Sequence, residues 1–275
     1  MTATERRTIS LALVGGGFMA EAILKGLVKA SIVRAADVAV AEPIEARREY
    51  LSGAFSGVQT ARDGAEAAPG HEVVLIAVKP QDFPKAAVVL RKVLAPDQLV
   101  LSIMAGVSIG SLSEALRHER VVRIMPNTPA SVGEGFSAWI ASASVGDAER
   151  AIVRRILGAV GREVEVHEER YLDMVTAISG SGPGYVFLFL EALIDASVYI
   201  GLPRPLATEM VSQTVLGSAK MAMIDERHPA QLRNMVTSAG GTTAAGLHVL
   251  ERSAMRATLT EAVIAAYEKS RALGG

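Results

Sequence analysis

The sequence predicts an α/β Rossmann-like N-terminal domain with a mostly parallel sheet, followed by an all-α C-terminal domain. Short apolar runs alternate with helical segments through the first half, which is typical of βαβ units. A glycine-rich turn joins the first of these runs to the first helical segment. The alternation stops near residue 167, and helical patterns fill the rest of the chain. We therefore expect a dinucleotide-binding domain over 1–167 and a helical dimerisation and substrate domain over 168–275.

The composition argues against several classes of protein. The 275 residues are 50% hydrophobic and 4% aromatic, include no cysteine and carry a formal net charge of -1. A chain so close to neutral has no field that attracts nucleic acid or anionic lipid, so we expect no nucleic-acid partner and no membrane association. The lack of cysteine excludes disulfides and thiolate metal sites, and no histidine or carboxylate pair has metal-ligand spacing. We expect a cytoplasmic protein without a metal.

Seven runs in the first half are predicted to be strands. Most are apolar at nearly every position, which indicates a sheet covered on both faces. Helical patterns such as AEAILKGLVKA and LSEALRHE lie between several of them. The predicted strands are 9–15, 38–42, 72–78, 99–104, 121–125 and 136–140, and a last one that ends near residue 167.

The turn after the first predicted strand has the pattern of a dinucleotide site. Gly15, Gly17 and Ala20 fit G-x-G-x-x-[GA]. Gly15 permits a sharp turn, Gly17 lets a pyrophosphate approach the backbone, and Ala20 lets helix and strand pack closely. The helix N-terminus offers free N–H groups to the phosphates. We expect a dinucleotide here, with Phe18 and Met19 among its contacts, and the alternative is a flexible turn in another kind of α/β protein.

The end of the second strand bears on which dinucleotide binds. A carboxylate at Glu42 would hydrogen-bond the ribose diol and favour NADH. Arg47 and Arg48 lie close behind and would instead pair with the 2′-phosphate of NADPH. A solvated helix face explains the two arginines equally well, so the pattern leaves the choice of cofactor open.

Two later strand ends supply further candidate cofactor contacts, because ligands of open α/β sheets bind at the carboxyl ends of strands. The third strand runs into Ala77, Val78, Lys79 and Pro80. The fifth runs into a proline-flanked loop whose polar residues, Asn127 and Thr128, would hold the nicotinamide carboxamide. The alternatives are an ordinary exposed lysine and a simple turn.

The second half is predicted to consist of helices. The segment 184–202 is apolar almost all round, which is typical of a buried helix, and Glu191 and Asp195 favour burial in protein over lipid. We expect it to pack against another subunit, and burial within its own chain is the alternative. Further helices are predicted over 204–224, 228–237 and 242–251, and from about 258 to the end.

The segment SAGGTT, residues 238–243, interrupts this helical pattern. Glycines let the backbone turn sharply, and a helix that begins at Thr242 or Thr243 points its unpaired N–H groups into the gap. Such a helix end suits the carboxylate of a small substrate. The alternative is a turn between helices in which Thr242 or Thr243 is the N-cap.

A set of motifs spread over nearly the whole chain resembles one enzyme family. These motifs are AVKPQ, SIMAGVS, RIMPNTPA, VTAISGSGPGYVFLFLEAL and HPAQLRNMVTSAGGTTAAGLHVLE. In this order they resemble pyrroline-5-carboxylate reductase, which makes L-proline from 1-pyrroline-5-carboxylate by hydride transfer from NADPH or NADH. The resemblance implies a Rossmann domain followed by a helical dimerisation domain, a homodimer that often assembles into a decamer of five dimers, and NADPH as the usual cofactor.

The resemblance also implies site residues. It makes Thr243 the catalytic residue that approaches the ring nitrogen, and it places Glu226 near the nicotinamide. The residues it places on the substrate are Ser238, Gly240, Gly241, Thr242 and Thr243. Two departures are Ala239, where the family commonly has proline, and Gly184, where it commonly has alanine. Neither departure removes a reacting group.

The predicted chemistry demands little of the protein. A protonated cyclic imine is already electrophilic at carbon, so the enzyme must mainly align donor and acceptor and exclude water. Two alternatives are a reductase of a related cyclic imine, such as pyrroline-2-carboxylate or a piperideine carboxylate, and a non-catalytic regulatory protein that senses NADPH.

Overall fold

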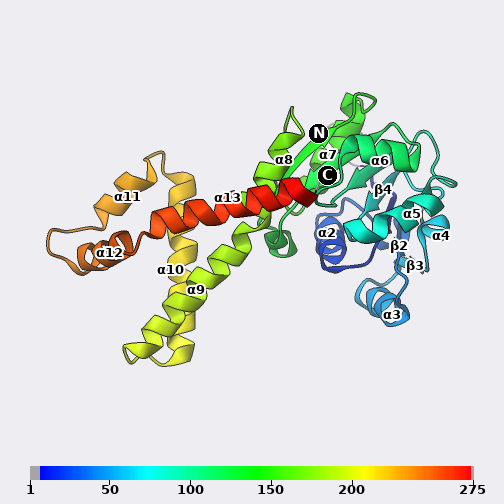
Figure 1. Ribbon diagram of the computed structural model, residues 1–275. Helices are drawn as coiled ribbons and strands as arrows, with labels where there is room; N and C mark the ends of the chain where they lie inside the picture. The colour runs from blue at the N-terminus through cyan, green and yellow to red at the C-terminus, as the bar shows by residue number, and fades with distance from the viewer. Residues whose placement is uncertain (1–6, 274–275) are drawn as a thin grey trace. The chain divides into compact units, whose positions relative to one another are not determined.

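The computed structural model describes residues 7–273, and its contacts divide the chain into two compact units (Figure 1). The first unit comprises the chain up to Ser181 together with the segment from Ala266 onward. The second comprises Gly182–Ala265. Residues 168–181, which the sequence places in the second domain, therefore pack with the first unit.

The first unit is built on one eight-stranded sheet in the order β3-β2-β1-β4-β5-β6-β7-β8. Neighbouring strands are parallel except β6 and β7, which are antiparallel. The predicted mostly parallel sheet is thus confirmed. The strands are β1 (Leu11–Val14), β2 (Val38–Ala41), β3 (Gln59–Ala61), β4 (Val73–Ile76), β5 (Leu99–Ser102), β6 (Val121–Met125), β7 (Gly135–Ala141) and β8 (Gly161–Glu165).

Helices cover both faces of this sheet. Leu11 and Leu13 of β1 pack in one apolar cluster with residues of α2 and α7. Ala12 and Val14, which point to the other face, pack with residues of α5 and α6. The helices of this unit are α2 (Phe18–Lys29), α3 (Glu45–Ala54), α4 (Gly64–Ala67), α5 (Phe83–Leu90), α6 (Ile109–Leu116), α7 (Asp147–Gly158) and α8 (Arg170–Val175). Short 3-10 turns are η1 (Ala35–Asp37), η2 (Pro80–Asp82) and η3 (Thr128–Val132), and η4 (Thr176–Gly180) is a π-helical turn.

Two details of the first unit differ from the sequence prediction. Strand β3 was not predicted, because it has only three residues at the sheet edge and no run of buried side chains. The helix predicted through LSEALRHE ends earlier, since Arg117 has a φ of 53° and its left-handed backbone terminates α6. The seven predicted strands are all present.

The order of the strands creates the crevice in which ligands of this architecture bind. Strand β1 pairs with β2 on one side and with β4 on the other, and the chain reaches β4 only after passing through β3. The connection after β1 leads to β2 on one side, and the connection after β4 leads to β5 on the other, so the two leave adjacent carboxyl ends in opposite directions. This is a topological switch point, and the glycine turn lies directly after β1.

The second unit consists of helices. Helices α9 and α10 lie side by side, joined by a turn at Gly201, whose φ is 107° (Figure 1). The helices are α9 (Gly182–Tyr199), α10 (Arg204–Ile224), α11 (Pro229–Met235) and α12 (Thr242–Arg252), and α13 (Met255–Leu273) begins in this unit and ends in the first. The predicted helices are confirmed.

The apolar residues of α9 are not buried by the rest of the chain. Among the described residues of this helix none is buried, and Phe187 and Leu188 are 63% and 67% exposed. The alternative of burial within its own chain is therefore wrong, because one copy offers no cover for a helix that is apolar on every face. The run Arg170–Tyr199 is also long and apolar enough to cross a membrane by length and composition alone.

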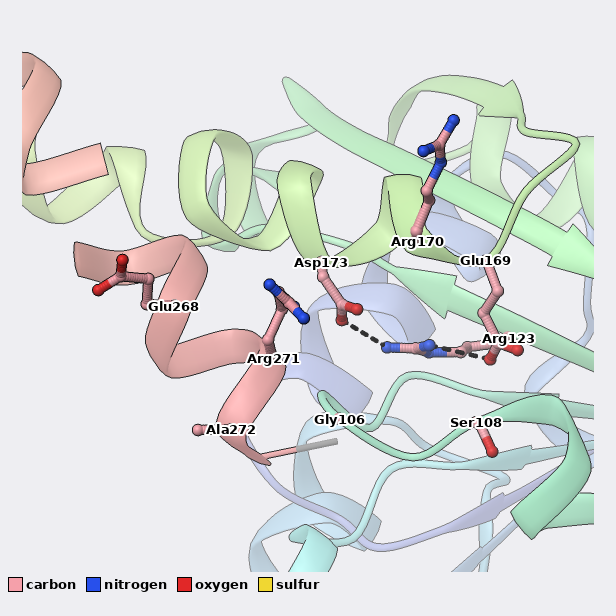
Figure 2. Close-up of a pocket in the computed structure, with 9 residues that line it drawn as sticks. All are labelled: Gly106, Ser108, Arg123, Glu169, Arg170, Asp173, Glu268, Arg271 and Ala272. Atoms are coloured by element: carbon pink, nitrogen blue, oxygen red, sulfur yellow. Dashed lines mark hydrogen bonds and ion pairs between the residues drawn. The ribbon is translucent and has the colours of Figure 1, made fainter. Parts of the chain in front are cut away.

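A buried arginine fixes α8 to the sheet (Figure 2). Arg123 of β6 is 5% exposed and donates to Glu169 at 2.9 Å and to Asp173 at 3.2 Å. Glu169 also accepts from the backbone N–H of Ile109, and Asp173 accepts from Ser270 of α13. These contacts explain why residues 168–181 pack with the first unit. Arg123, Glu169 and Asp173 line a cavity of about 560 Å³, in whose wall they pair with one another.

We expect Arg123→Met to lower the free energy of unfolding by about 1–3 kcal/mol, because two carboxylates would lose a buried partner. The single tryptophan, Trp139, is buried in β7, so its fluorescence during urea unfolding reports on this unit. Arg34→Met is the control, since the Arg34 side chain is 71% exposed in its pair with Asp37 and should contribute far less to the free energy of unfolding. Equal effects of the two changes would contradict this account.

Candidate active site

The turn after β1 accepts only glycine at its first position. Gly15 has a φ of 104°, and its N–H donates to the carbonyl of Ala41 at 2.8 Å. A Cβ on Gly15 would lie 2.8 Å from the carbonyl oxygen of Ala77, at the end of β4. Because a side chain would meet both an unfavourable backbone conformation and a steric clash, the tight packing of β1 against β4 depends on this glycine.

Gly17 is a glycine for a different reason. Its φ is -71°, which other residues adopt, and a Cβ there would meet nothing within 4 Å. The residue is the N-cap of α2 and makes no side-chain cap, so the N–H groups of Phe18, Met19 and Ala20 have no helical partner. Ala20 is 1% exposed and packs in the core as predicted. Open space before uncapped N–H groups fits a pyrophosphate.

A cavity of about 650 Å³ lies at these strand ends. Its wall includes Val14 of β1, Ala41 of β2 and, after β4, Ala77. Gly15 and Gly17 line the same cavity. Its size is within the range of small-molecule sites, and it lies where an open α/β sheet binds its ligand. The residues present therefore fit a dinucleotide, which is the predicted ligand of this turn.

The carboxylate of Glu42 makes two hydrogen bonds to the backbone. One oxygen accepts from the N–H of Gly16 and the other from the N–H of Ile44, each at 3.0 Å. Glu42 is 8% exposed and lines the cavity. The carboxylate therefore joins the glycine turn to the loop after β2.

Arg47 and Arg48 are also held by the protein. Arg47 donates to the carbonyl of Gly16 at 2.7 Å and pairs with Glu21, which also accepts from Tyr50. Burial raises the pKa of the Glu21 carboxyl, but the hydrogen bonds from Arg47 and Tyr50 outweigh it and leave the pKa below its usual value. Arg48 donates to the carbonyls of Glu42 and Pro43, at 2.7 and 2.9 Å. The two arginines thus stabilise the turn and the loop beside it.

The residues predicted at the later strand ends divide into two groups. Ala77, Val78 and Lys79 line the cavity, and Pro80 follows as the first residue of η2. Asn127 instead links its own loop to neighbouring backbone and side chains. Its amide donates to Ser179 at 3.0 Å, and its carbonyl accepts from the N–H of Phe136 at 2.8 Å. Thr128 begins η3, which packs against α2.

Several cavity residues were missed by sequence reasoning. Arg62, Asp63 and Gly64 follow β3, and Lys85 lies on α5. The first three had no visible signal because β3 itself was not recognised. Within residues 7–273 no group of three histidine, aspartate or glutamate side chains is placed to hold a metal ion.

In the second unit, the predicted substrate residues 238–243 form the turn before α12 and the first two positions of that helix. Gly240 has a φ of 69°, and the N–H of Gly241 donates to the carbonyl of Ser238 at 3.1 Å. Gly241 is the N-cap, so Thr242 and Thr243 are the first two residues of the helix. No side chain caps this end. The alternative in which one of the threonines is the N-cap is therefore wrong, and the first N–H groups of α12 remain without helical partners.

The segment between α10 and α11 contains the remaining predicted residue, Glu226, which is exposed. Its neighbours form a pair in which Arg227 donates to Asp225 and lowers the pKa of that carboxyl to about 2. His228 accepts from the N–H of Ala230 and caps α11.

We expect Gly17→Val to weaken dinucleotide binding and Gly15→Val to destabilise the fold. Gly17→Val should leave the melting temperature nearly unchanged but weaken NADP binding at least about 10-fold, since the side chain fills the open space before the N–H groups. Gly15→Val should destabilise the fold by about 1–3 kcal/mol, because its backbone and its contact with Ala77 both exclude a side chain. Calorimetric titration and thermal unfolding separate the two. Normal binding by Gly17→Val would rule out this phosphate site.

Comparisons with known proteins agree with the two-part architecture. The family model described as pyrroline-5-carboxylate reductase dimerisation matches residues 169–273, and that described as NADP oxidoreductase coenzyme F420-dependent matches residues 10–106. Pyrroline-5-carboxylate reductase from Synechocystis sp. is 45% identical over 273 residues, which cover 97% of this chain and 99% of that protein. The Escherichia coli enzyme is 38% identical over 264 residues, with 96% and 97% covered.

Solved structures give the same result. Plasmodium falciparum pyrroline carboxylate reductase, solved with NADP bound, has a TM-score of 0.89 at 34% identity, covering 97% of this chain and 98% of that one. The pyrroline-5-carboxylate reductase from Coxiella burnetii has a TM-score of 0.88 at 33% identity, covering 98% and 100%. With a dinucleotide cavity in one unit, a matched dimerisation region and relatives alike over their full length, this chain belongs to the pyrroline-5-carboxylate reductase family.

Proposed function

We propose that this chain reduces 1-pyrroline-5-carboxylate to L-proline with NADPH, the last step of proline biosynthesis, and that the turn 238–243 binds the substrate. The observation that carries the proposal is the uncapped N-terminus of α12 behind Gly240 and Gly241, in a chain that also has a dinucleotide cavity. Unpaired N–H groups at a helix end attract a carboxylate, and the substrate has one carboxylate. The family's relatives support this substrate over the related imines and over a sensor without activity.

Each residue of the turn has a specific task in this proposal. The backbone N–H groups of Thr242 and Thr243 and the hydroxyl of Ser238 hold the carboxylate, and Gly241 has no side chain to obstruct it. Gly240 supplies the left-handed bend that lets the turn close around it. The hydroxyl of Thr243 hydrogen-bonds the ring nitrogen, as donor to the imine or acceptor from the iminium.

The cofactor site follows from the first unit. The N–H groups at the start of α2 would hold the pyrophosphate, and Gly17 keeps the approach open. NADPH supplies the hydride that adds to the carbon of the C=N bond, and Glu226 lies near the nicotinamide in this proposal. Because the iminium carbon is already electrophilic, orientation and exclusion of water account for most of the catalysis. Further proposed contacts are Phe18, Met19, Ala20, Glu42, Ala77, Val78, Lys79, Pro80, Asn127 and Thr128.

The assembly is proposed to be a homodimer, with a decamer of five dimers as its larger form. The dimerisation family model covers the helical region, and the exposed apolar side chains of that region need a cover. They include Phe187, Leu188, Ile200, Met223 and Ile224. A second copy would bury the apolar run that is also long enough for a membrane span. We propose a cytoplasmic enzyme without membrane or nucleic-acid partners. The boundary between its two functional domains is proposed to lie between residues 167 and 168.

We expect Thr243→Ala to lower kcat/KM for 1-pyrroline-5-carboxylate by about 10- to 100-fold, since one hydrogen bond to a partly charged group is lost. The KM for NADPH should stay within about twofold. The loss of absorbance of the reduced nicotinamide gives both values. Thr243→Ser keeps the hydroxyl and should recover most of the rate. A Thr243→Ala enzyme with normal turnover, or one that fails to bind NADPH, would show that Thr243 is misassigned.

We expect Leu188→Glu to convert the assembled protein to monomers, because a charge would enter an apolar contact between copies. Sedimentation velocity measures the change. Val88→Glu on α5 is the matched control, since Val88 is also an exposed apolar residue, at 44%, and lies in the first unit. If Leu188→Glu assembles as the unchanged protein does, α9 is not at the interface.

A further inference from the structure

One arginine of the dinucleotide cavity has no assigned role. Arg62 directly follows β3, and the parallel register pairs Ala61 of β3 with Ala41 of β2. The N–H of Glu42 donates to the carbonyl of Ala61 at 2.9 Å, so Arg62 and Glu42 follow neighbouring strands at the same level. Both residues line the cavity. Arg62 therefore lies beside the end of β2, where Rossmann proteins recognise the 2′ position of the adenosine ribose.

The carboxylate at the end of β2 is already engaged. Both Glu42 oxygens accept backbone N–H groups, from Gly16 and Ile44, and the residue is 8% exposed. Each oxygen keeps a further acceptor site, so the two N–H bonds fix the orientation of the carboxylate without excluding a ribose hydroxyl. Glu42 thus positions the glycine turn.

The two arginines behind β2 are engaged as well. Arg47 is held by Glu21 and by the carbonyl of Gly16, and Arg48 by the carbonyls of Glu42 and Pro43. Neither lines the cavity. The guanidinium of Arg62, by contrast, is exposed and makes no hydrogen bond or ion pair with the residues that the structure describes.

The two acidic side chains close to Arg62 in sequence, Asp63 and Glu66, are bound to backbone. Asp63 accepts from the N–H groups of Ala65 and Glu66 at the start of α4. Glu66 accepts from the backbone N–H of Arg62 itself at 3.2 Å. Lys85 adds a second cation to the cavity wall from α5, and Asp82 adds a further carboxylate. The guanidinium therefore remains available to a phosphate.

We propose that Arg62 binds the 2′-phosphate of NADPH and is the residue that makes this enzyme prefer NADPH to NADH. The inference rests on the proposed function only in the identity of the cofactor. A guanidinium presents several donors to a phosphate at once, which gives both affinity and discrimination against the 2′-hydroxyl of NADH.

The test compares adenosine 2′,5′-bisphosphate with adenosine 5′-monophosphate by calorimetry on the full chain. The two probes differ only in the 2′-phosphate. The unchanged protein should bind the bisphosphate at least about 10-fold more tightly, and Arg62→Gln should remove this difference. Affinity for the monophosphate should be unaffected, which also verifies that the variant is folded. Arg48→Gln is the matched control and should keep the discrimination.

Kinetics give a second readout. Arg62→Gln should lower the ratio of kcat/KM for NADPH to that for NADH by about 10-fold or more, through the KM for NADPH and not through kcat. Discrimination retained by Arg62→Gln, lost in Arg48→Gln, or absent from the unchanged protein would overturn the proposal. Failure to turn over 1-pyrroline-5-carboxylate with intact bisphosphate binding would instead count against the proposed function and leave Arg62 supported.

Discussion

The close approach of β1 to the end of β4 determines the geometry of the dinucleotide cavity in the first unit. At Gly15 the backbone passes so near the Ala77 carbonyl that a Cβ would lie 2.8 Å from it. That approach turns the chain sharply into α2 and leaves the first N–H groups of the helix facing a cavity. Glu42 then holds the turn from the neighbouring strand through the N–H of Gly16. A phosphate site here therefore needs backbone geometry more than particular side chains.

Two helices of the chain have an N-terminus of the same kind. Helices α2 and α12 both begin after a glycine N-cap that makes no side-chain cap. In each case a glycine with positive φ precedes the N-cap, Gly15 before Gly17 and Gly240 before Gly241. Each helix end consequently offers bare N–H groups and the positive end of its dipole. An enzyme that transfers hydride between two anionic molecules can use one such end for each.

Much of the fold and part of the site followed from the sequence, for identifiable reasons. Apolar runs predicted most of the seven longer strands, and the glycine pattern predicted the turn after β1. Strand β3 was missed because an edge strand of three half-exposed residues has no periodicity to detect. Arg62 was missed for the same reason, because its position beside Glu42 depends on the pairing of β3 with β2. The hydrogen bonds that Glu42 and Asn127 accept could not be predicted either, since they depend on which backbone groups lie near each side chain.

The helical unit has little interior of its own. Of the described apolar residues in Gly182–Ala265, only Ala207 and Val211 are buried. An element with so small a core gains its stability from whatever covers its outer faces, so its folding free energy contains a concentration term. Dilution then acts on this half of the molecule as a denaturant would, while the sheet of the other half keeps its own core. How much folded catalyst a cell holds is accordingly set by how much of the chain it makes, as well as by the sequence.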